Sequence, residues 1–165
     1  MMGHNHVIAG AILYLAVDWS LGSGGTAPAL SNCLAAAALG SLAPDLDSPK
    51  SYLGRRFWPV SWTVTSLLGH RGFTHSLLAG LLVFLGLVVA GQYLPGWFAY
   101  FMALGIGYAS HILADWFTTE GVPLFWPHRK KFRSPLHFRT GGLGEVWFSL
   151  TAGSGLAFWL YRHLV

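Results

Sequence analysis

The sequence predicts an all-α polytopic membrane protein, a bundle of about five transmembrane or membrane-embedded helices in a single domain over residues 1–165. Hydrophobic residues make up 53% of the chain and charged residues only 10%, whereas soluble domains carry about 25% charged residues. No Asp, Glu, Lys or Arg occurs between Gly72 and Ala114. Because a membrane-spanning helix needs about 20 apolar residues, this stretch is long enough for two spans.

Five apolar stretches are the expected helices, at about residues 7–21, 27–43, 77–94, 97–114 and 146–161. The first two are short enough to be buried helices that do not fully cross a membrane. The second contains LAAAALG, a run of small residues that suits close helix packing. Pro95 and Gly96 separate the third and fourth helices and favour a turn between them.

The basic residues indicate how the helices are oriented. Nine of the ten lie in two loops: Lys50, Arg55, Arg56 and Arg71 in one, and Arg129, Lys130, Lys131, Arg133 and Arg139 in the other. The tenth, Arg162, lies near the C-terminus, which this topology places outside. The opposite loops, LGSGGTAP and GQYLPGW, carry no Lys or Arg. The positive-inside rule therefore predicts a multi-pass protein of a bacterial or archaeal inner membrane, with both basic loops and most histidines and acids on the cytoplasmic side.

Charge and cysteine content exclude several other classes. The net charge of +4 is explained by topology, so we expect no nucleic-acid partner. The basic run over residues 128–139 could attract anionic lipid headgroups, although topological charge is the simpler interpretation. The single Cys33 excludes a multi-cysteine zinc site. The opening MMGHNHVIAG lacks a basic region, so we expect no cleaved signal peptide.

The segment HILAD is the first candidate for a metal site. His111 and Asp115 are four residues apart, so they share one face of a helix and can bind one metal ion. They lie at the end of an apolar span, where ionisable groups are costly and usually functional. The alternative, a neutral histidine beside a helix-end aspartate at the interface, is equally favoured by this segment alone.

The segment APDLDSP offers two carboxylates. Pro44 and Pro49 disfavour a regular helix, and in an extended segment Asp45 and Asp47 would point the same way. Two close carboxylates repel each other unless a cation or a proton lies between them. Taken alone, this segment is better explained as a simple turn, since Pro and Asp both favour turns.

The segment GHRGFTHS precedes the third helix. Ser76 or Thr74 can cap that helix, and the glycine-flanked loop could bring His70 back towards His75. Arg71 could hold a phosphate or carboxylate. An interfacial loop with a helix cap is the alternative, but it does not explain two histidines. His6, at the start of the first helix, is a weaker candidate.

These segments together predict a metal site on the cytoplasmic side. Imidazole and carboxylate are the ligands of zinc and similar divalent ions, and seven residues are candidates: His6, Asp45, Asp47, His70, His75, His111 and Asp115. We expect one or two ions, zinc first and manganese or iron as alternatives. No HExxH, GxSxG or P-loop motif is present, so the usual metalloprotease, esterase and nucleotide-binding classes are not indicated.

The motifs HVIAG, PDLD, HRGFTHS and HILADWFTTEGVPLFWP resemble, in this order, the YdjM-type family of inner-membrane, membrane-bound metal-dependent hydrolases. A more distant likeness is to zinc-dependent phospholipase C and the single-strand nucleases, which are helical and hold zinc with His and Asp. That likeness implies phosphoester hydrolysis by a metal-activated water. It also implies further ligands, for which only His128, His137 and Glu145 are available, at spacings that match poorly.

The expected function is therefore a membrane-embedded metal-dependent hydrolase that cleaves a phosphoester, of a lipid or another anionic membrane-associated substrate. Asp45 and His70 are the candidate catalytic residues beside the metal, and Arg71 is the candidate phosphate-binding residue. The alternative is a metal-binding or transport protein without hydrolysis. A transporter usually places charged ligands near the middle of the membrane, whereas these residues lie towards one surface.

Overall fold

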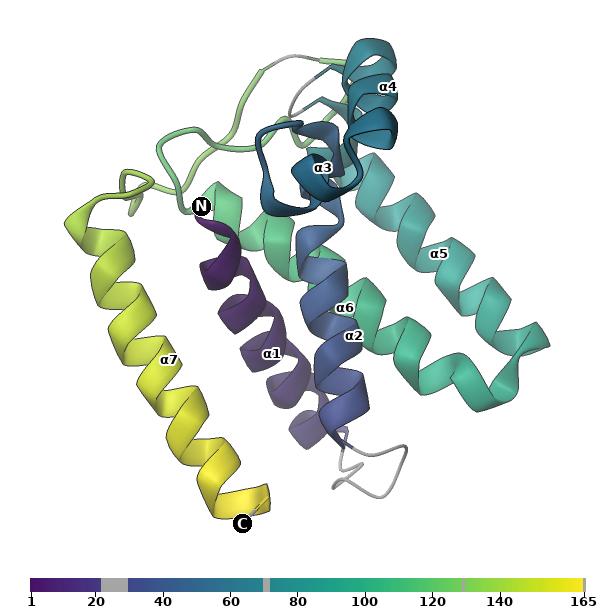
Figure 1. The fold of residues 1–165 in the computed structure, drawn as a ribbon, viewed down its shortest axis with the longest axis vertical. Coiled ribbons are helices and arrows are strands. Elements are labelled where there is room, and N and C mark those ends of the chain that lie inside the picture. Colours follow the sequence, from purple (N-terminus) through teal and green to yellow (C-terminus); the bar gives the residue numbers. More distant parts are fainter. Residues whose placement is uncertain (22–29, 70–71, 129, 165) are drawn as a thin grey trace.

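The all-α prediction is confirmed by a computed structural model that describes residues 1–21, 30–69, 72–128 and 130–164 (Figure 1). The longer helices are α1 (Gly3–Ser20), α2 (Leu30–Leu42), α4 (Trp58–Leu68), α5 (Leu77–Tyr93), α6 (Phe98–Trp116) and α7 (Leu143–Leu164). The short ones are α3 (Tyr52–Arg56) and the 3-10 turns η1 (Pro44–Asp47), η2 (Phe73–His75) and η3 (Pro95–Trp97).

All five expected helices are present within the described residues. The third and fourth agree with their predicted limits to within about two residues, and Pro95 and Gly96 form the turn η3 between them. Ser76 caps α5, since its hydroxyl accepts a hydrogen bond from the backbone N–H of Ala79 at 3.1 Å. The last helix begins earlier than predicted, at Leu143. Residues 27–29, the predicted start of the second helix, lie outside the described residues.

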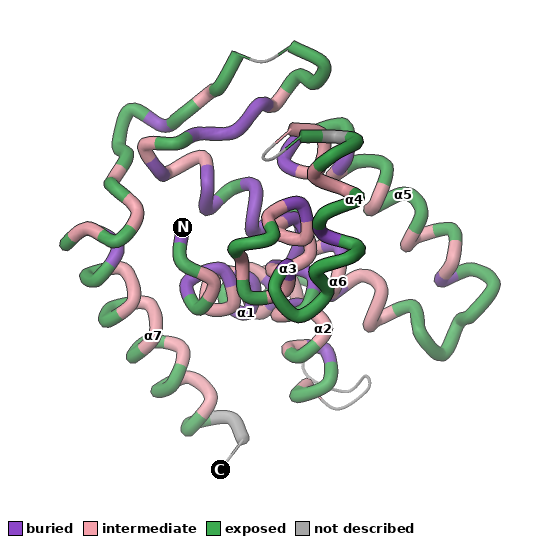
Figure 2. Tube along the Cα trace, turned by 45° about the horizontal axis from the view of Figure 1, so that its top comes forward, coloured by how far each residue is buried: buried purple, intermediate pink, exposed green. Residues whose placement is uncertain are grey.

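The centre of the bundle is a close contact between α2 and α6, with α1 packed against both. A Cβ atom on Gly40 would lie 2.0 Å from the backbone oxygen of Leu104, and one on Gly107 would lie 2.0 Å from that of Ala37. Glycine is therefore required at both positions. The small-residue run of α2 packs as predicted, and Figure 2 shows buried residues concentrated where α1, α2 and α6 meet.

Two helices were not expected between α2 and α5. Ser51 caps the short helix α3 by accepting a hydrogen bond from the Gly54 N–H at 2.9 Å. Pro59 occupies the first turn of α4, where a missing N–H group costs little. No helix was predicted over this stretch, because its apolar and aromatic residues follow no clear helical period. The structure leaves many of them exposed.

The chain between α6 and α7 runs over one end of the bundle with little regular structure (Figure 1). It is held by two isolated β-bridges, one of which pairs Val122 with Phe132. A backbone hydrogen bond from the Leu77 N–H to the Leu124 carbonyl, at 3.0 Å, attaches it to the start of α5. This segment covers the end of the bundle at which α1 and α5 begin.

Among the described residues, one helical stretch is both long and apolar enough to cross a membrane, Pro95–Trp116. The other strongly apolar helix, α5, is shorter than this test requires. What the fold does establish is an antiparallel pair, α5 and α6, packed against each other.

Replacing Gly107 by alanine should separate α2 from α6, because the new methyl group has no room beside the Ala37 carbonyl. Overpacking of this kind costs about 1–3 kcal/mol, or about 2–10 °C in apparent Tm for a chain of this size. Thermal unfolding in a neutral detergent would measure it. Gly86→Ala on α5 is the control, since its methyl group would meet no atom within 4 Å. Equal Tm values for the two variants would contradict the close contact.

Candidate metal centre

Four elements that are distant in sequence bring their His and Asp side chains together at one end of the bundle. They contribute His6 (α1), Asp45 (η1), His75 (η2), and His111 with Asp115 (α6). Four of these side chains are at most 1% exposed, and Asp45 is 19% exposed. Buried ionisable groups are costly unless they are paired or bind a metal ion, so a cluster of this kind indicates a functional site.

Distances between possible donor atoms fit one divalent ion. The Nε2 atoms of His75 and His111 are 3.1 Å apart, and each lies 3.8 Å from Oδ2 of Asp115. Oδ1 of Asp45 lies 4.0 Å from Nε2 of His75 and 3.9 Å from that of His111. Tetrahedral zinc with bonds of 2.0–2.1 Å requires ligand atoms about 3.3 Å apart. Small movements would therefore bring all four donors to bonding distance.

The outer nitrogen of two of the three imidazoles, those of His75 and His111, is held by a hydrogen-bond acceptor. Nδ1 of His111 lies 2.6 Å from the backbone oxygen of Ser41, and Nδ1 of His75 lies 3.2 Å from Oδ2 of Asp47. These acceptors favour a proton on each Nδ1, which leaves a lone pair on each Nε2. Two lone pairs that face each other at 3.1 Å repel unless a cation or a proton lies between them. The residues present thus fit a bound metal ion.

The structure places Asp45 and Asp47 on different sides of His75. Asp45 and Asp47 do not point the same way from an extended segment, because residues 44–47 form the turn η1. They lie at opposite nitrogens of the His75 ring, Asp45 near Nε2 and Asp47 near Nδ1. Asp47 also accepts a hydrogen bond from the hydroxyl of Thr74. Oδ2 of Asp47 therefore orients His75. Carboxylates commonly orient a metal-binding histidine in this way, by accepting a hydrogen bond from its second ring nitrogen.

His6 forms a second donor group that overlaps the first. Its ring stacks on His111, with centroids 3.7 Å apart and planes 13° from parallel. Donor atoms of His6, Asp45 and His111 lie within 4.8 Å of one another, as do those of His75, His111 and Asp115. Nε2 of His6 and the amino group of Met1 lie 3.5 and 2.7 Å from Oδ1 of Asp115. Two groups that share His111 are compatible with one ion or two.

The remaining candidates do not join this cluster among the described residues. His70 and Arg71 lie outside the part of the chain that the structure describes. His128 is exposed, and Nδ1 of His137 lies 2.9 Å from the Ser134 carbonyl oxygen. Glu145 is fully buried at the start of α7, where it accepts hydrogen bonds from the start of α1.

Glu145 attaches α7 to the start of α1. Its Oε1 accepts hydrogen bonds from the Met2 N–H at 2.5 Å and from the Asn5 side chain at 2.8 Å, and its Oε2 accepts one from the Gly141 N–H at 2.6 Å. Burial raises the pKa of Glu145, but these donors outweigh it and hold the pKa below its usual value. The carboxylate thus fixes the segment that carries His6.

Ser41 and Asn5 were not predicted as site residues, and Glu145 was considered only as a further ligand and not as a supporting residue. Ser41 acts through its backbone carbonyl, which no sequence pattern reveals. Asn5 and Glu145 are 140 positions apart in the chain, so only tertiary contacts show that they act together. Asn5 lies in the HNH stretch next to His6, and a polar residue inside an apolar helix was the one signal available.

Comparison with known proteins identifies the family of this chain. The profile of the family described as YdjM inner membrane protein matches residues 1–163. The chain belongs to the YdjM inner membrane protein family. The family resemblance predicted from the motifs is thus confirmed, while the distant likeness to phospholipase C stays a prediction. No solved structure gives a significant match.

Individual relatives show how far the similarity extends. The chain is 50% identical over 104 residues to the proteins named inner membrane protein YdjM of Escherichia coli and Shigella flexneri. These alignments cover 61% of this chain and 52% of each relative, so the chain spans about half the length of these YdjM proteins. A Bacillus subtilis protein named uncharacterized protein YvsG is 34% identical over 165 residues, which are 99% of this chain and 98% of that protein.

Ligand and orienting residues should differ in their effect on metal content. Asp115→Ala removes a donor and should abolish stoichiometric metal binding, whereas Asp47→Asn should weaken affinity about 10–100-fold, the usual effect of losing a group that orients a ligand. Elemental mass spectrometry of the purified variants, with titration of added zinc, measures both. Unchanged metal content in Asp115→Ala would show that this carboxylate is not a ligand.

Proposed function

We propose that the protein is a membrane-embedded metal-dependent hydrolase that cleaves a phosphoester of a lipid or another membrane-associated substrate. The observation that carries the proposal is the pair of imidazole Nε2 atoms that face each other at 3.1 Å beside two carboxylates. A divalent ion held there, zinc in the first instance, would lower the pKa of a bound water to about 7 and would polarise the phosphoryl oxygen.

The protein's own residues divide the remaining work. His75, His111 and Asp115 would hold the ion, and Ser41 and Asp47 fix the two imidazole rings through their outer nitrogens. Asp45 is the most exposed of the donor residues. Its carboxylate is therefore placed to meet substrate and to accept a proton from the attacking water, the role of a general base. His70 and Arg71 remain expected to assist and to hold the phosphate.

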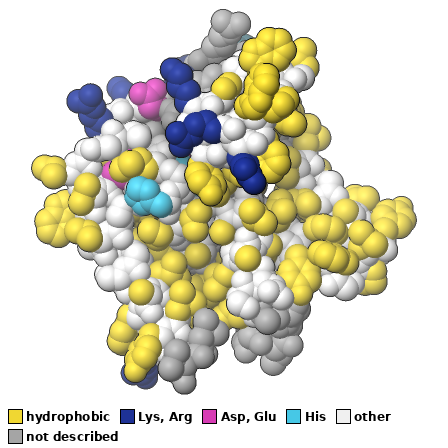
Figure 3. All heavy atoms as spheres, viewed as in Figure 1, with side chains coloured by type: hydrophobic (Ala, Val, Ile, Leu, Met, Phe, Trp, Pro, Cys, Tyr) yellow, Lys and Arg dark blue, Asp and Glu magenta, His cyan; other side chains and the backbone are white. Residues whose placement is uncertain are grey.

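A bacterial inner membrane is the proposed location, with several spans and the metal centre on the cytoplasmic side. Support comes from the family, from the apolar pair α5 and α6, and from the surface of α5, where Leu78, Leu81, Leu82, Leu85 and Val89 are exposed. Figure 3 shows most Lys and Arg side chains of this face gathered at one end, the end where α1 begins. The positive-inside rule places that end in the cytoplasm.

Metal binding without hydrolysis is the rival function. The centre lies at the end of the bundle, where α1 begins and α6 ends. Most transporters instead place their binding site near the middle of the membrane. This position favours an enzyme that meets its substrate at the membrane surface. The two functions differ in whether metal content and phosphoester hydrolysis are lost together.

The decisive experiment measures metal content and hydrolysis on the same purified protein. We expect one or two equivalents of metal and activity on an anionic phospholipid or a chromogenic phosphoester. His75→Ala should lower both at least about 100-fold, since it removes a donor. His128→Ala is the control, because that exposed histidine lies outside the donor groups. Full metal content with no hydrolysis of any phosphoester would overturn the proposed enzyme activity and favour metal binding without hydrolysis.

The proposed topology predicts which loops reagents can reach. In a Cys33→Ala background, Lys130→Cys should react with a membrane-impermeant maleimide in inverted membrane vesicles, and Gly96→Cys in the turn η3 should react in intact spheroplasts. Both positions are exposed, so folding should not prevent labelling. Reaction of both cysteines from the same side would show that α5 and α6 do not place these loops on opposite faces.

A further inference from the structure

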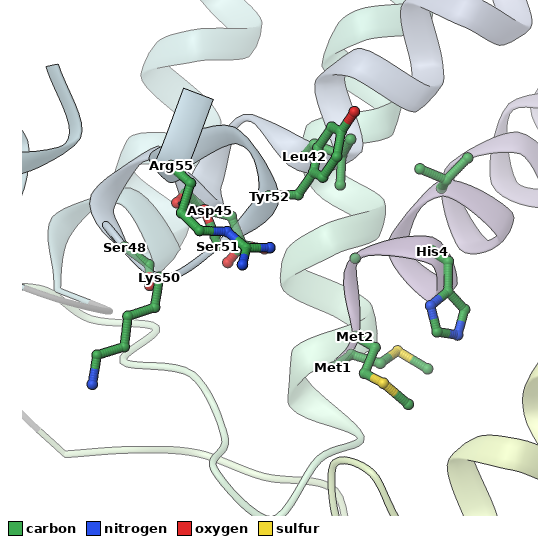
Figure 4. Close-up of a pocket in the computed structure, with 12 residues that line it drawn as sticks. Met1, Met2, His4, Leu42, Asp45, Ser48, Lys50, Ser51, Tyr52 and Arg55 are labelled. Carbon is green, nitrogen blue, oxygen red and sulfur yellow. Dashed lines mark hydrogen bonds between the residues drawn. The ribbon is translucent and has the colours of Figure 1, made fainter. Parts of the chain in front are cut away.

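A cavity of about 690 Å³ opens beside the metal centre and is not used by the mechanism above (Figure 4). It lies between the start of α1, the end of α2 and the segment that runs from η1 to α3. This volume is within the range of pockets that bind small ligands, about 300–1,000 Å³. Asp45 lines the cavity and also belongs to the donor cluster, so a molecule in this pocket touches the centre.

One part of the lining is cationic and rich in hydrogen-bond donors. Lys50 and Arg55 line the pocket together with the hydroxyl-bearing Ser48 and Ser51. Figure 4 shows the Arg55 side chain running from its helix towards Asp45 and Ser51. A guanidinium and an ammonium group beside a metal centre are the groups that recognise phosphate.

The other part of the lining is apolar. It consists of Met2, Val7, Leu42 and Tyr52, and Figure 4 labels three of them, Met2, Leu42 and Tyr52. Tyr52 is 72% exposed, so the apolar wall continues to the surface of the molecule. A pocket with a cationic wall and an apolar wall suits an amphiphile, whose anion and hydrocarbon each find a matching surface.

The geometry of this pocket is anchored to the centre. The hydroxyl of Ser51 donates a hydrogen bond to the Asp45 carbonyl at 2.7 Å, and a Cβ on Gly54 would lie 1.8 Å from the Ser48 oxygen. The helix that carries Arg55 is therefore packed directly on the turn that carries Asp45. Because of this contact, the distance between the cationic wall and the donor cluster is fixed by the fold.

We infer that this cavity binds a phosphate monoester or diester that carries an apolar group. The anion lies between Lys50 and Arg55, and the apolar group lies against Met2, Val7, Leu42 and Tyr52. The inference rests on the proposed function for the identity of the bond that is cleaved, and it names the substrate class: a phosphate with an attached hydrocarbon. Binding itself can be measured without any turnover.

The test is calorimetric titration of the full chain in dodecyl maltoside, a phosphate-free detergent, with hexyl phosphate, inorganic phosphate and hexanol. Arg55→Gln should weaken binding of both phosphates about tenfold, since it removes a charge-assisted contact. Tyr52→Ser should weaken the binding of hexyl phosphate about threefold and leave the binding of inorganic phosphate unchanged. Arg56→Gln is the matched control, an exposed neighbour on the same helix that is not among the residues lining the pocket.

Each outcome bears on a distinct part of the proposal. Equal phosphate affinities of Arg55→Gln and Arg56→Gln would show that Arg55 does not bind the anion. Equal affinity for hexyl phosphate and inorganic phosphate would overturn the apolar wall and identify free phosphate as the ligand. Metal content is measured on the same samples. Full metal content without phosphate binding overturns the proposed pocket alone. If the protein takes up no metal even when zinc is added, but still binds phosphate in a way that depends on Arg55, the pocket is supported and the proposed hydrolase is overturned.

Discussion

The contact between α2 and α6 determines where the donor atoms lie. Gly40 and Gly107 let the two backbones approach until no side chain fits between them. One turn further along, this approach brings the Ser41 carbonyl to 2.6 Å from Nδ1 of His111. The same carbonyl fixes the proton on the outer nitrogen and turns Nε2 inwards. The orientation of the His111 ring therefore depends directly on how closely α2 and α6 pack.

The sequence predicted the helices well where the signal is local. The charge-free stretch from Gly72 to Ala114 is long enough for two helices, and Pro95 with Gly96 marked their turn. The spacing of His111 and Asp115 placed both on one face of α6, and the structure has their donor atoms 3.8 Å apart. Helices α3 and α4 were missed because their apolar residues remain exposed and leave no period to detect.

The site was less predictable because it depends on contacts between distant segments. The sequence could name His75 and the two carboxylates of the PDLD turn as candidates, but it could not say which nitrogen of the ring each carboxylate faces. That follows from the 3-10 turn and from Thr74, which donates a hydrogen bond to Asp47. Ser41 and Glu145 act through backbone or long-range contacts, so no motif could have included them.

The convergence of η1, η2 and α6 on one set of donor atoms has a consequence for folding. An ion bound there would be a reversible cross-link between segments such as His75 and His111, which are 36 residues apart. A ligand that binds only the folded state stabilises it by about 2.7 kcal/mol at 100 times its Kd. Chelation would therefore remove the cross-link among η1, η2 and α6, and it would loosen the pocket wall formed by α3, which is hydrogen-bonded to η1. In a cell starved of the metal, the protein would lose its metal centre and, with it, the fixed shape of the pocket alongside.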